Sequence, residues 1–558
     1  MRDRRRGLAI GFVTAVFIAL VVCGVAALLY ARVATATSRP AETINPWTVH
    51  GVVRIGSKDL PDTLGPMLGE QYVDDDLVQL WGGFLLAWND QDQYVPDLAV
   101  AVPSFDNGGI SQDGLTFTYH LRKHVLWQDG APFTARDVVF SWHAVMNPRN
   151  FIASRAGYEL ISRIDTPDPY TVVIHLRRRF APFLGTFFAP SSEPVPVMPE
   201  HLLARYPDLN DIPYNALPIG TGPFRVVADQ QMRFIRFVAN PLYWRGRPGL
   251  NEIDFEWLPD DRALLDALRE HRIDVYLEGA QALEPQLQGN RGYSVYLYPF
   301  TRFADLGFNM SKPQLQDRRV RQALAFATDR MRIIDEVTNG VNIPADSDQP
   351  PFGWAYSSAV PKYPYDPRRA GQLLDAAGWR LGPDGLRRQG GLTMRLELVG
   401  WTGSVTAAEA ESEIAREWRA VGVDTVVHNY SSDALYADKS EGGIQQNGRF
   451  DVTYEEWGFG VDPDDSNIFE CGATPPEGWN IYHYCDPALD AAEADALTRY
   501  DVAGRKAAYA RIQAILAGDL PLLPLWYVQS QDVVNIDLRN YKPAHAFAPL
   551  WNSWEWKI

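Results

Sequence analysis

The sequence predicts a mixed α/β (α+β) body in which short strands and helices interleave along the chain. Segments that alternate apolar and polar residues are followed by segments with apolar residues at helical spacing, and 43 Gly and 40 Pro separate them. The chain has 558 residues, which is enough for three or four domains of about 150 residues or for two large lobes.

The predicted elements follow one another from residue 52 to residue 518. Alternating apolar residues predict strands over 52–56, 115–121, 170–176, 224–227, 233–239 and 252–257. Helical spacing predicts helices over 75–88, 136–146, 260–271, 318–339, 367–377, 407–421 and 502–518. Thr134 is a suitable N-cap for the second of these helices, because its side chain can accept a backbone hydrogen bond.

The first 38 residues form a basic tip followed by an apolar segment. Arg2, Arg4, Arg5 and Arg6 precede an uncharged run of 25 residues over 7–31, which can span about 30 Å of hydrocarbon as a helix. Basic residues stay on the cytoplasmic side, so the rest of the chain is expected outside the cytoplasm, with 39–47 as a tether.

This segment has three interpretations. It is an uncleaved transmembrane anchor, a signal peptide cut after the small residues 34–36, or a lipidation signal at Cys23. All three place the body in the periplasm or at the outer face of the cell membrane.

The body of the protein is strongly acidic. The formal net charge is −17, and the first 38 residues carry +4, which leaves −21 for the rest. This charge excludes broad nucleic-acid binding, which needs a cationic surface.

Motifs for catalysis are missing. The sequence has no Gly-Lys dipeptide, no H-E-x-x-H, no C-x-x-C and no G-x-S-x-G. Asp462, Asp464 and Asp465 lack the rest of a calcium-loop pattern. Cys471 and Cys485 are the only cysteines outside the apolar run, and they are a disulfide, two free thiols or a metal pair. We therefore expect no cofactor, no metal and no enzymatic activity.

Aromatic residues are abundant, with 17 Trp, 25 Tyr and 25 Phe. Several stand in polar, Gly-rich or Pro-rich surroundings: Trp354, Tyr356, Trp401, Trp457, Trp479 and Tyr482. Aromatic side chains in such loops can form flat walls around a small ligand. Ordinary packing is the alternative for each one alone.

Several motifs occur in a fixed order along the chain. They cover 115–142 (LTFTYHLRKHVLWQDGAPFTARDVVFSW), 218–225 (PIGTGPFR), 240–245 (NPLYWR), 317–330 (DRRVRQALAFATDR), 365–379, 457–463 (WGFGVDP), 480–490 and 505–525. Over about residues 50–535 the chain thereby resembles the extracytoplasmic solute-binding proteins of family 5, which serve peptide and nickel ABC importers.

The resemblance implies the two-lobed periplasmic-binding-protein (Venus flytrap) fold of the large peptide-binding type, with an extra domain. The chain is expected to pass between the lobes near 299–301 and 520–524. Lobe I would combine 48–88, 217–299 and 521–558, the extra domain would cover 89–216, and lobe II would cover 300–520.

The resemblance also implies ligand-binding residues in a cleft between the lobes. Trp457 and Trp401 would form apolar walls, and Asp462, Asn480 and Tyr482 would orient the ligand. Some peptide binders of the family have an Asp for the peptide's amino terminus where this chain has Phe459. Either Asp462 replaces that carboxylate or the ligand has no free amine. Cys471 and Cys485 match a disulfide loop found in some dipeptide-binding members.

By this resemblance the protein is the substrate-binding component of an ABC importer. It would act as a monomer that takes up a peptide or another small solute and delivers it to the permease subunits. One alternative is a membrane-anchored solute sensor with the same fold. The other is an exported hydrolase that uses Asp462, Asp464 or Glu456 as acid and base.

Overall fold

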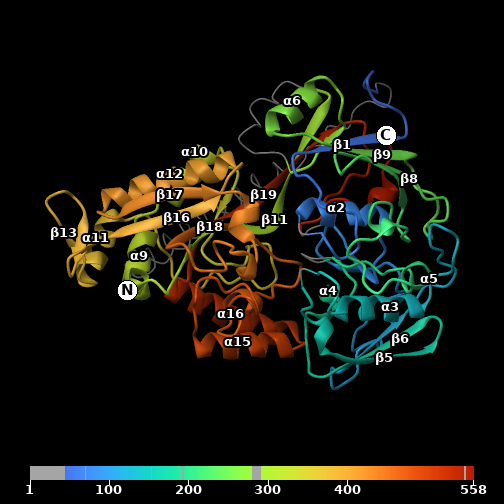
Figure 1. The fold of residues 1–558 in the computed structure, drawn as a ribbon, viewed down its shortest axis with the longest axis horizontal. Coiled ribbons are helices and arrows are strands. Elements are labelled where there is room, and N and C mark those ends of the chain that lie inside the picture. Colours follow the sequence, from blue (N-terminus) through green and yellow to red (C-terminus); the bar gives the residue numbers. More distant parts are fainter. Residues whose placement is uncertain (1–43, 70, 153, 191–193, 279–290, 546–547) are drawn as a thin grey trace, which may run out of the picture.

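The computed structural model describes residues 44–558, apart from 70, 153, 191–193, 279–290 and 546–547. Two lobes lie side by side, and two long strands run between them (Figure 1). The predicted anchor or signal peptide and most of the predicted tether lie outside the described residues. Within the described part of the chain, no helix combines the length and the apolar character that crossing a membrane requires.

Both lobes share one large sheet, in the order β17-β16-β18-β11-β19-β10-β1-β9-β8-β7, with β12 also on β19. Its central strands, β11 (Tyr293–Phe308) and β19 (Leu522–Asn535), pair in antiparallel fashion from one lobe to the other. Their register shifts between Pro299 and Phe303 and again between Ala304 and Asp305. The first shift lies at the predicted crossing point near 299–301.

Lobe I is built around β1, which pairs in parallel with β9 and β10. In strand β8, half-buried and buried residues alternate, because only one of its faces covers the core. The elements of lobe I are β1 (Val52–Ser57), α2 (Tyr72–Trp81), β7 (Phe224–Asp229), β8 (Phe234–Ala239), β9 (Glu252–Trp257), α6 (Asp261–Arg269) and β10 (Val275–Tyr276).

The extra domain packs a three-stranded sheet, in the order β4-β6-β5, against short helices. Thr134 caps helix α3 as predicted, and Asp137 accepts a return hydrogen bond from the backbone of Thr134. The elements are β2 (Leu86–Trp88), β3 (Tyr94–Pro96), β4 (Thr116–His120), α3 (Ala135–Met146), β5 (Ile161–Asp168), β6 (Thr171–Leu176), α4 (Phe183–Thr186) and α5 (Glu200–Leu203).

Lobe II covers both faces of its part of the sheet, each with its own hydrophobic core. The first face carries α9 (Arg318–Phe326), α10 (Arg330–Val337), α11 (Pro367–Ala376) and α12 (Val405–Ala420). The second face carries α13 (Ser432–Tyr436), α14 (Ser466–Phe469), α15 (Pro487–Thr498) and α16 (Val502–Asp519). The other elements are α8 (Pro313–Gln316), β12 (Ile343–Pro344), β13 (Arg380–Leu381), β14 (Arg387–Gln389), β15 (Leu392–Thr393), β16 (Arg395–Trp401), β17 (Asp424–Tyr430) and β18 (Val452–Gly458).

Two predicted helices were wrong in length. The helix predicted over 75–88 ends at Trp81, because Gly82 is extended and a Cβ at Gly83 would lie 1.9 Å from the hydroxyl of Thr221. The helix predicted over 318–339 is two helices, α9 and α10. The second one begins where Asp329 accepts a hydrogen bond from its own first turn.

The first described residues are fixed to lobe I. The backbone of Asn45 donates to Asp537 at 2.7 Å. The Trp47 ring stacks on His271, with centroids 3.7 Å apart and planes at 7°. The chain therefore joins the body of the protein on lobe I.

Arg321 fixes the start of the second crossing between the lobes. It is 3% exposed and donates to the carbonyl oxygens of Leu315 at 2.6 Å and of Leu520 at 2.9 Å. A third donated bond reaches the carbonyl of Asp519 at 2.5 Å. At Leu520 the backbone has a φ of +50°, so these bonds hold the turn from α16 into β19.

We expect Arg321→Ala to lower the free energy of unfolding by about 3 kcal/mol, because it leaves buried carbonyl groups without donors. Urea unfolding measures this change. The matched control on the same helix is Arg318→Ala, because the Arg318 side chain is 67% exposed. A loss of stability that is equal in both variants would contradict the role of Arg321.

Two buried carboxyl groups face each other across β11 and β18, where Asp305 pairs with Glu455. Glu455 accepts a hydrogen bond from Thr453 at 2.8 Å, whereas neither carboxyl oxygen of Asp305 has a partner in the described part of the chain. Burial raises the pKa of Glu455 to about 8 and the pKa of Asp305 well above its ordinary value. Glu455 therefore keeps its proton at neutral pH.

Because the folded state holds the proton on Glu455, the free energy of unfolding falls as the pH rises. Unfolded Glu455 has an ordinary pKa of 4.5, so the folded state binds more protons between 4.5 and about 8, and the stabilisation is lost across that range. We expect Glu455→Gln to unfold about 5 °C higher than the wild type near pH 9 and no higher near pH 4. Thermal unfolding at several pH values, with exposed Glu441→Gln as control, checks this. A difference that does not change with pH would refute it.

Candidate functional site

Residues 457–465, which we call the crossing segment, leave β18 and run along the boundary between the lobes. The backbone N–H of Phe459 donates to the carbonyl of Thr301 at 2.9 Å, and the Thr301 hydroxyl donates back to the carbonyl of Phe459 at 2.5 Å. Val461 packs against the buried rings of Tyr298 and Phe300. The crossing segment is thereby fixed to β11 at the point where β11 passes between the lobes.

Trp457 and Tyr482, two of the residues predicted to line the ligand site, are in contact with each other. The indole Nε1–H of Trp457 donates to the Tyr482 hydroxyl at 2.6 Å, and Trp479 meets the Trp457 ring edge-on at 6.4 Å. Burial raises the pKa of Tyr482 well above its ordinary value. Gly307 makes room for this ring, because a Cβ there would lie 2.2 Å from it.

Asp462 is paired within the protein. Both of its carboxylate oxygens accept hydrogen bonds from Arg505 at 2.7 Å, and the Arg505 guanidinium lies over the Trp354 ring at 5.1 Å. The side chain of Asp462 is only 14% exposed. A ligand that used Asp462 would have to compete with this bidentate ion pair.

Three other predicted residues serve the packing around the site. Asn480 is fully buried and donates to the carbonyl of Tyr484 at 2.8 Å. Phe459 stacks on Phe303, and Trp401 is half-buried beside Tyr454, with ring centroids 5.3 Å apart. These contacts describe where the residues lie, and the ligand role given to them from the sequence stays a prediction.

A disulfide closes the loop that contains Asn480. Cys471 and Cys485 are joined, with their Cα atoms 4.4 Å apart. Asn480 also donates to the carbonyl of Glu470 at 3.0 Å, so the same loop is tied together by covalent and hydrogen bonds.

A second group of charged side chains gathers where β11 crosses. Arg302 lies 3.4 Å from Glu456 of lobe II and 3.9 Å from Glu278 of lobe I, and its guanidinium is 5.5 Å from the Tyr72 ring. Burial alone would lower the pKa of Arg302. The nearby carboxylates of Glu456 and Glu278 have the larger combined effect, so the pKa of Arg302 is raised above its ordinary value. Burial and the nearby Glu278 raise the pKa of Asp76 well above its ordinary value.

Of this second group, sequence reasoning named only Glu456, as an acid or base of the alternative hydrolase. Arg302 follows directly after the crossing predicted at 299–301, and a charged residue at such a position was a usable signal. Glu278 and Tyr72 gave none, because the fold brings them to Arg302 from distant parts of the chain.

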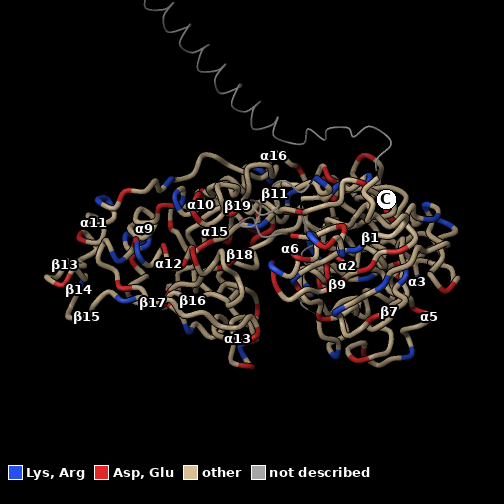
Figure 2. Tube along the Cα trace, turned by 90° about the horizontal axis from the view of Figure 1, so that it is seen from above, with Lys and Arg blue, Asp and Glu red and all other residues tan. Residues whose placement is uncertain are grey.

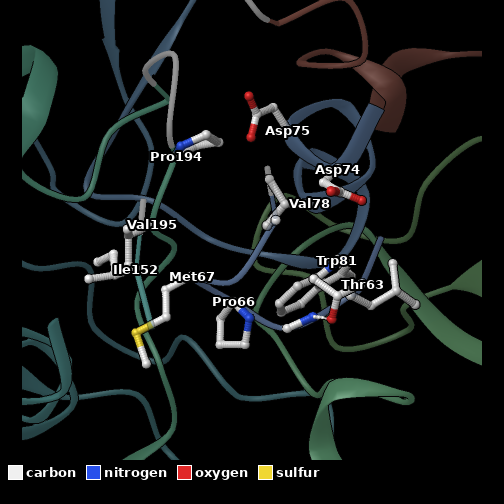
Figure 3. A pocket seen from close by; sticks show the side chains of 13 residues that line it. Thr63, Pro66, Met67, Asp74, Asp75, Val78, Trp81, Ile152, Pro194 and Val195 are labelled. Atoms are coloured by element: carbon white, nitrogen blue, oxygen red, sulfur yellow. Dashed lines mark hydrogen bonds between the residues drawn. The ribbon is translucent and has the colours of Figure 1, made fainter. Parts of the chain in front are cut away.

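A small pocket lies between α2, residues 63–69 and residues 194–195 (Figure 3). Asp74 lies at its edge, and burial raises the pKa of that carboxyl to about 7. The pocket measures about 30 Å³, which is room for one or two water molecules. It is therefore too small for a solute.

The boundary suits non-covalent binding. It offers aromatic side chains, carboxylates and the guanidinium groups of Arg302 and Arg505. Among the described residues, no group of three or more His, Cys, Asp or Glu side chains has the arrangement to hold a metal ion. Lys and Arg are interspersed with Asp and Glu over both lobes, without an extended basic face in the described part of the chain (Figure 2).

Known proteins match most of the chain. It is 28% identical to Protein XP55 of Streptomyces lividans, over 88% of this chain and 87% of that one. It is 24% identical to the oligopeptide-binding protein AppA of Bacillus subtilis, over 91% of each chain.

A solved structure matches as well. NikZ of Campylobacter jejuni, in complex with Ni(L-His), superposes with a TM-score of 0.80 at 25% identity and covers 92% of this chain and 100% of NikZ. This match confirms the predicted two-lobed periplasmic-binding-protein fold. Residues 93–477 match the family of bacterial extracellular solute-binding proteins, family 5, in its middle part. The predicted family is confirmed, and the chain belongs to the bacterial extracellular solute-binding proteins of family 5.

Proposed function

We propose that this protein binds a peptide or a related small solute between its lobes and delivers it to the permease of an ABC importer. The observation that carries the proposal is the meeting of groups from both lobes at Arg302, which contacts Glu278 on one side and Glu456 on the other. A ligand that replaces or extends these contacts interacts with both lobes at once and favours their closure.

The matched proteins support this ligand class. AppA is named an oligopeptide-binding protein, and NikZ is in complex with a nickel–histidine chelate. Both ligands contain amino acids, which carry amine and carboxylate groups. A peptide or an amino acid chelate is therefore the first choice for this protein.

The charge at the boundary favours a ligand with a positive group. Arg302 is the guanidinium between Glu278 and Glu456, and Asp76 adds a third carboxyl group nearby. Asp462 already has Arg505 as its partner. We therefore place a ligand amine nearer to Glu278 and Glu456 than to Asp462.

Aromatic side chains would hold the rest of the ligand. Trp457 and Trp401 are the walls that we propose, because both rings are only partly buried in the second core of lobe II, and the buried Tyr482 would position Trp457 through its hydrogen bond. Phe459 and Asn480 would act indirectly, since both are buried and shape the crossing segment and the disulfide loop.

The protein would work outside the cytoplasm without changing its ligand. Family members are binding proteins. Residues 1–38 would keep the protein at the membrane as an anchor, or direct its export as a signal peptide. A monomer held near the permease gains effective concentration.

A titration tests the proposal. We expect the tryptophan fluorescence of the purified protein to change with at least one member of a panel of short peptides, oligosaccharides and nickel–histidine, and mass spectrometry to recover the bound molecule unchanged. An acetylated amino terminus should weaken peptide binding.

We expect Trp457→Ala to weaken the binding about tenfold, because a buried aromatic contact is commonly worth more than 1 kcal/mol. The control is Trp551→Phe in the C-terminal segment. The proposed function would be refuted if no ligand of the panel changed the tryptophan fluorescence and no molecule co-purified with the protein.

A further inference from the structure

The last turn of α15 and the loop that follows it belong to lobe II, but their side chains pack into the extra domain. Leu497 is 6% exposed and lies in the core cluster of that domain, with Phe117 and Phe183 among its members. Tyr500 packs against the same cluster, and its ring meets Phe105 edge-on at 5.4 Å. In Figure 1, α15 and α16 accordingly lie against the domain that carries α4.

Backbone hydrogen bonds cross the boundary at the same place. The N–H of Ala181 in the extra domain donates to the carbonyl of Leu497 at 2.7 Å. The Tyr500 hydroxyl donates to the carbonyl of Gly114 at 2.7 Å. These bonds join lobe II directly to the extra domain.

The surface of the extra domain leaves space for the ring of Tyr500. Gly114 has a φ of +71°, and a Cβ there would lie 2.4 Å from the Tyr500 ring. The Arg179 guanidinium lies 5.4 Å from the centroid of the same ring. Glycine at 114 therefore meets two demands at once, a left-handed backbone and space for an aromatic ring from the other lobe.

Arg505 links this loop to the crossing segment. It binds both carboxylate oxygens of Asp462 at 2.7 Å and donates through Nε to the carbonyl of Ala496 at 3.0 Å. Asp462 lies against the extra domain. A Cβ added to Gly185 of that domain would be 3.9 Å from the Cβ of Asp462. The segment that borders the proposed ligand site is thus joined through one side chain to the loop that contacts the extra domain.

We infer that residues 496–500 form a latch that holds the lobes closed, and that the Asp462–Arg505 pair couples the crossing segment to the latch. Every latch contact joins protein to protein, so the latch stabilises closure with or without a solute. A solute that binds the closed form gains affinity in proportion to the closed population. The strength of the latch thereby determines how much of the free energy of lobe closure ligand binding has to supply.

Distance measurements between the lobes test the latch. The full chain carries Cys23→Ser, with spin labels on cysteines placed at Arg163 of β5 and Arg416 of α12, whose side chains are each 64% exposed. Double electron–electron resonance without any ligand then gives the populations of short and long distances. Because no ligand is used, a failure of the proposed solute function leaves this test intact.

We expect a mostly short distance in the wild type. The ratio of open to closed molecules should rise about thirtyfold in Leu497→Ala and about threefold in Tyr500→Phe, which removes one hydroxyl and keeps the ring. The control Val502→Ala alters the first residue of α16, two positions after Tyr500, at a side chain that is 65% exposed, and it should leave the ratio unchanged.

The coupling has its own variant. Asp462→Asn keeps the shape of the side chain but weakens its bond to Arg505, and we expect the open fraction to rise at least about twofold. An unchanged ratio in this variant would overturn the coupling. The latch is overturned if the wild type is mostly open, if Leu497→Ala and Tyr500→Phe match the wild type, or if Val502→Ala opens the lobes as far.

Discussion

The pairing of β11 with β19 is the constraint on which the two-lobed arrangement depends. These strands are hydrogen-bonded to each other along both lobes, so neither lobe can move without bending the same ladder. The ladder loses its regular register between Pro299 and Phe303, and a change of backbone angles costs least there. Thr301 and Arg302 lie within this irregular stretch, and the crossing segment is hydrogen-bonded to Thr301. The proposed ligand site therefore borders the irregular stretch of the β11–β19 ladder.

Local signals predicted much of the fold. Strand β9 and helix α3 were found from alternation, helical spacing and the cap at Thr134, because these signals lie in neighbouring residues. Strand β19 was not predicted, since it is buried on both faces and has no alternation to detect. The end of α2 was also missed, although Gly82 and Gly83 follow its last residue directly and two consecutive glycines are a local signal for the end of a helix.

The candidate site was predictable only in part. Trp457 and Tyr482 were singled out by their sequence surroundings, and they are in contact in the structure. The partner of Asp462 was not foreseeable, because Arg505 lies on another element and only folding brings the two together. The family resemblance supplied the order of the motifs, but it says nothing of which charged groups neutralise one another.

The attachment of residues 45–48 to lobe I has a mechanical consequence. The Trp47–His271 stack and the bond from Asn45 to Asp537 make the incoming chain continuous with that lobe. Whatever holds the N-terminal end therefore holds lobe I still. Closure would then move lobe II relative to lobe I, and a partner protein that recognises the ligand-bound state would detect the position of lobe II.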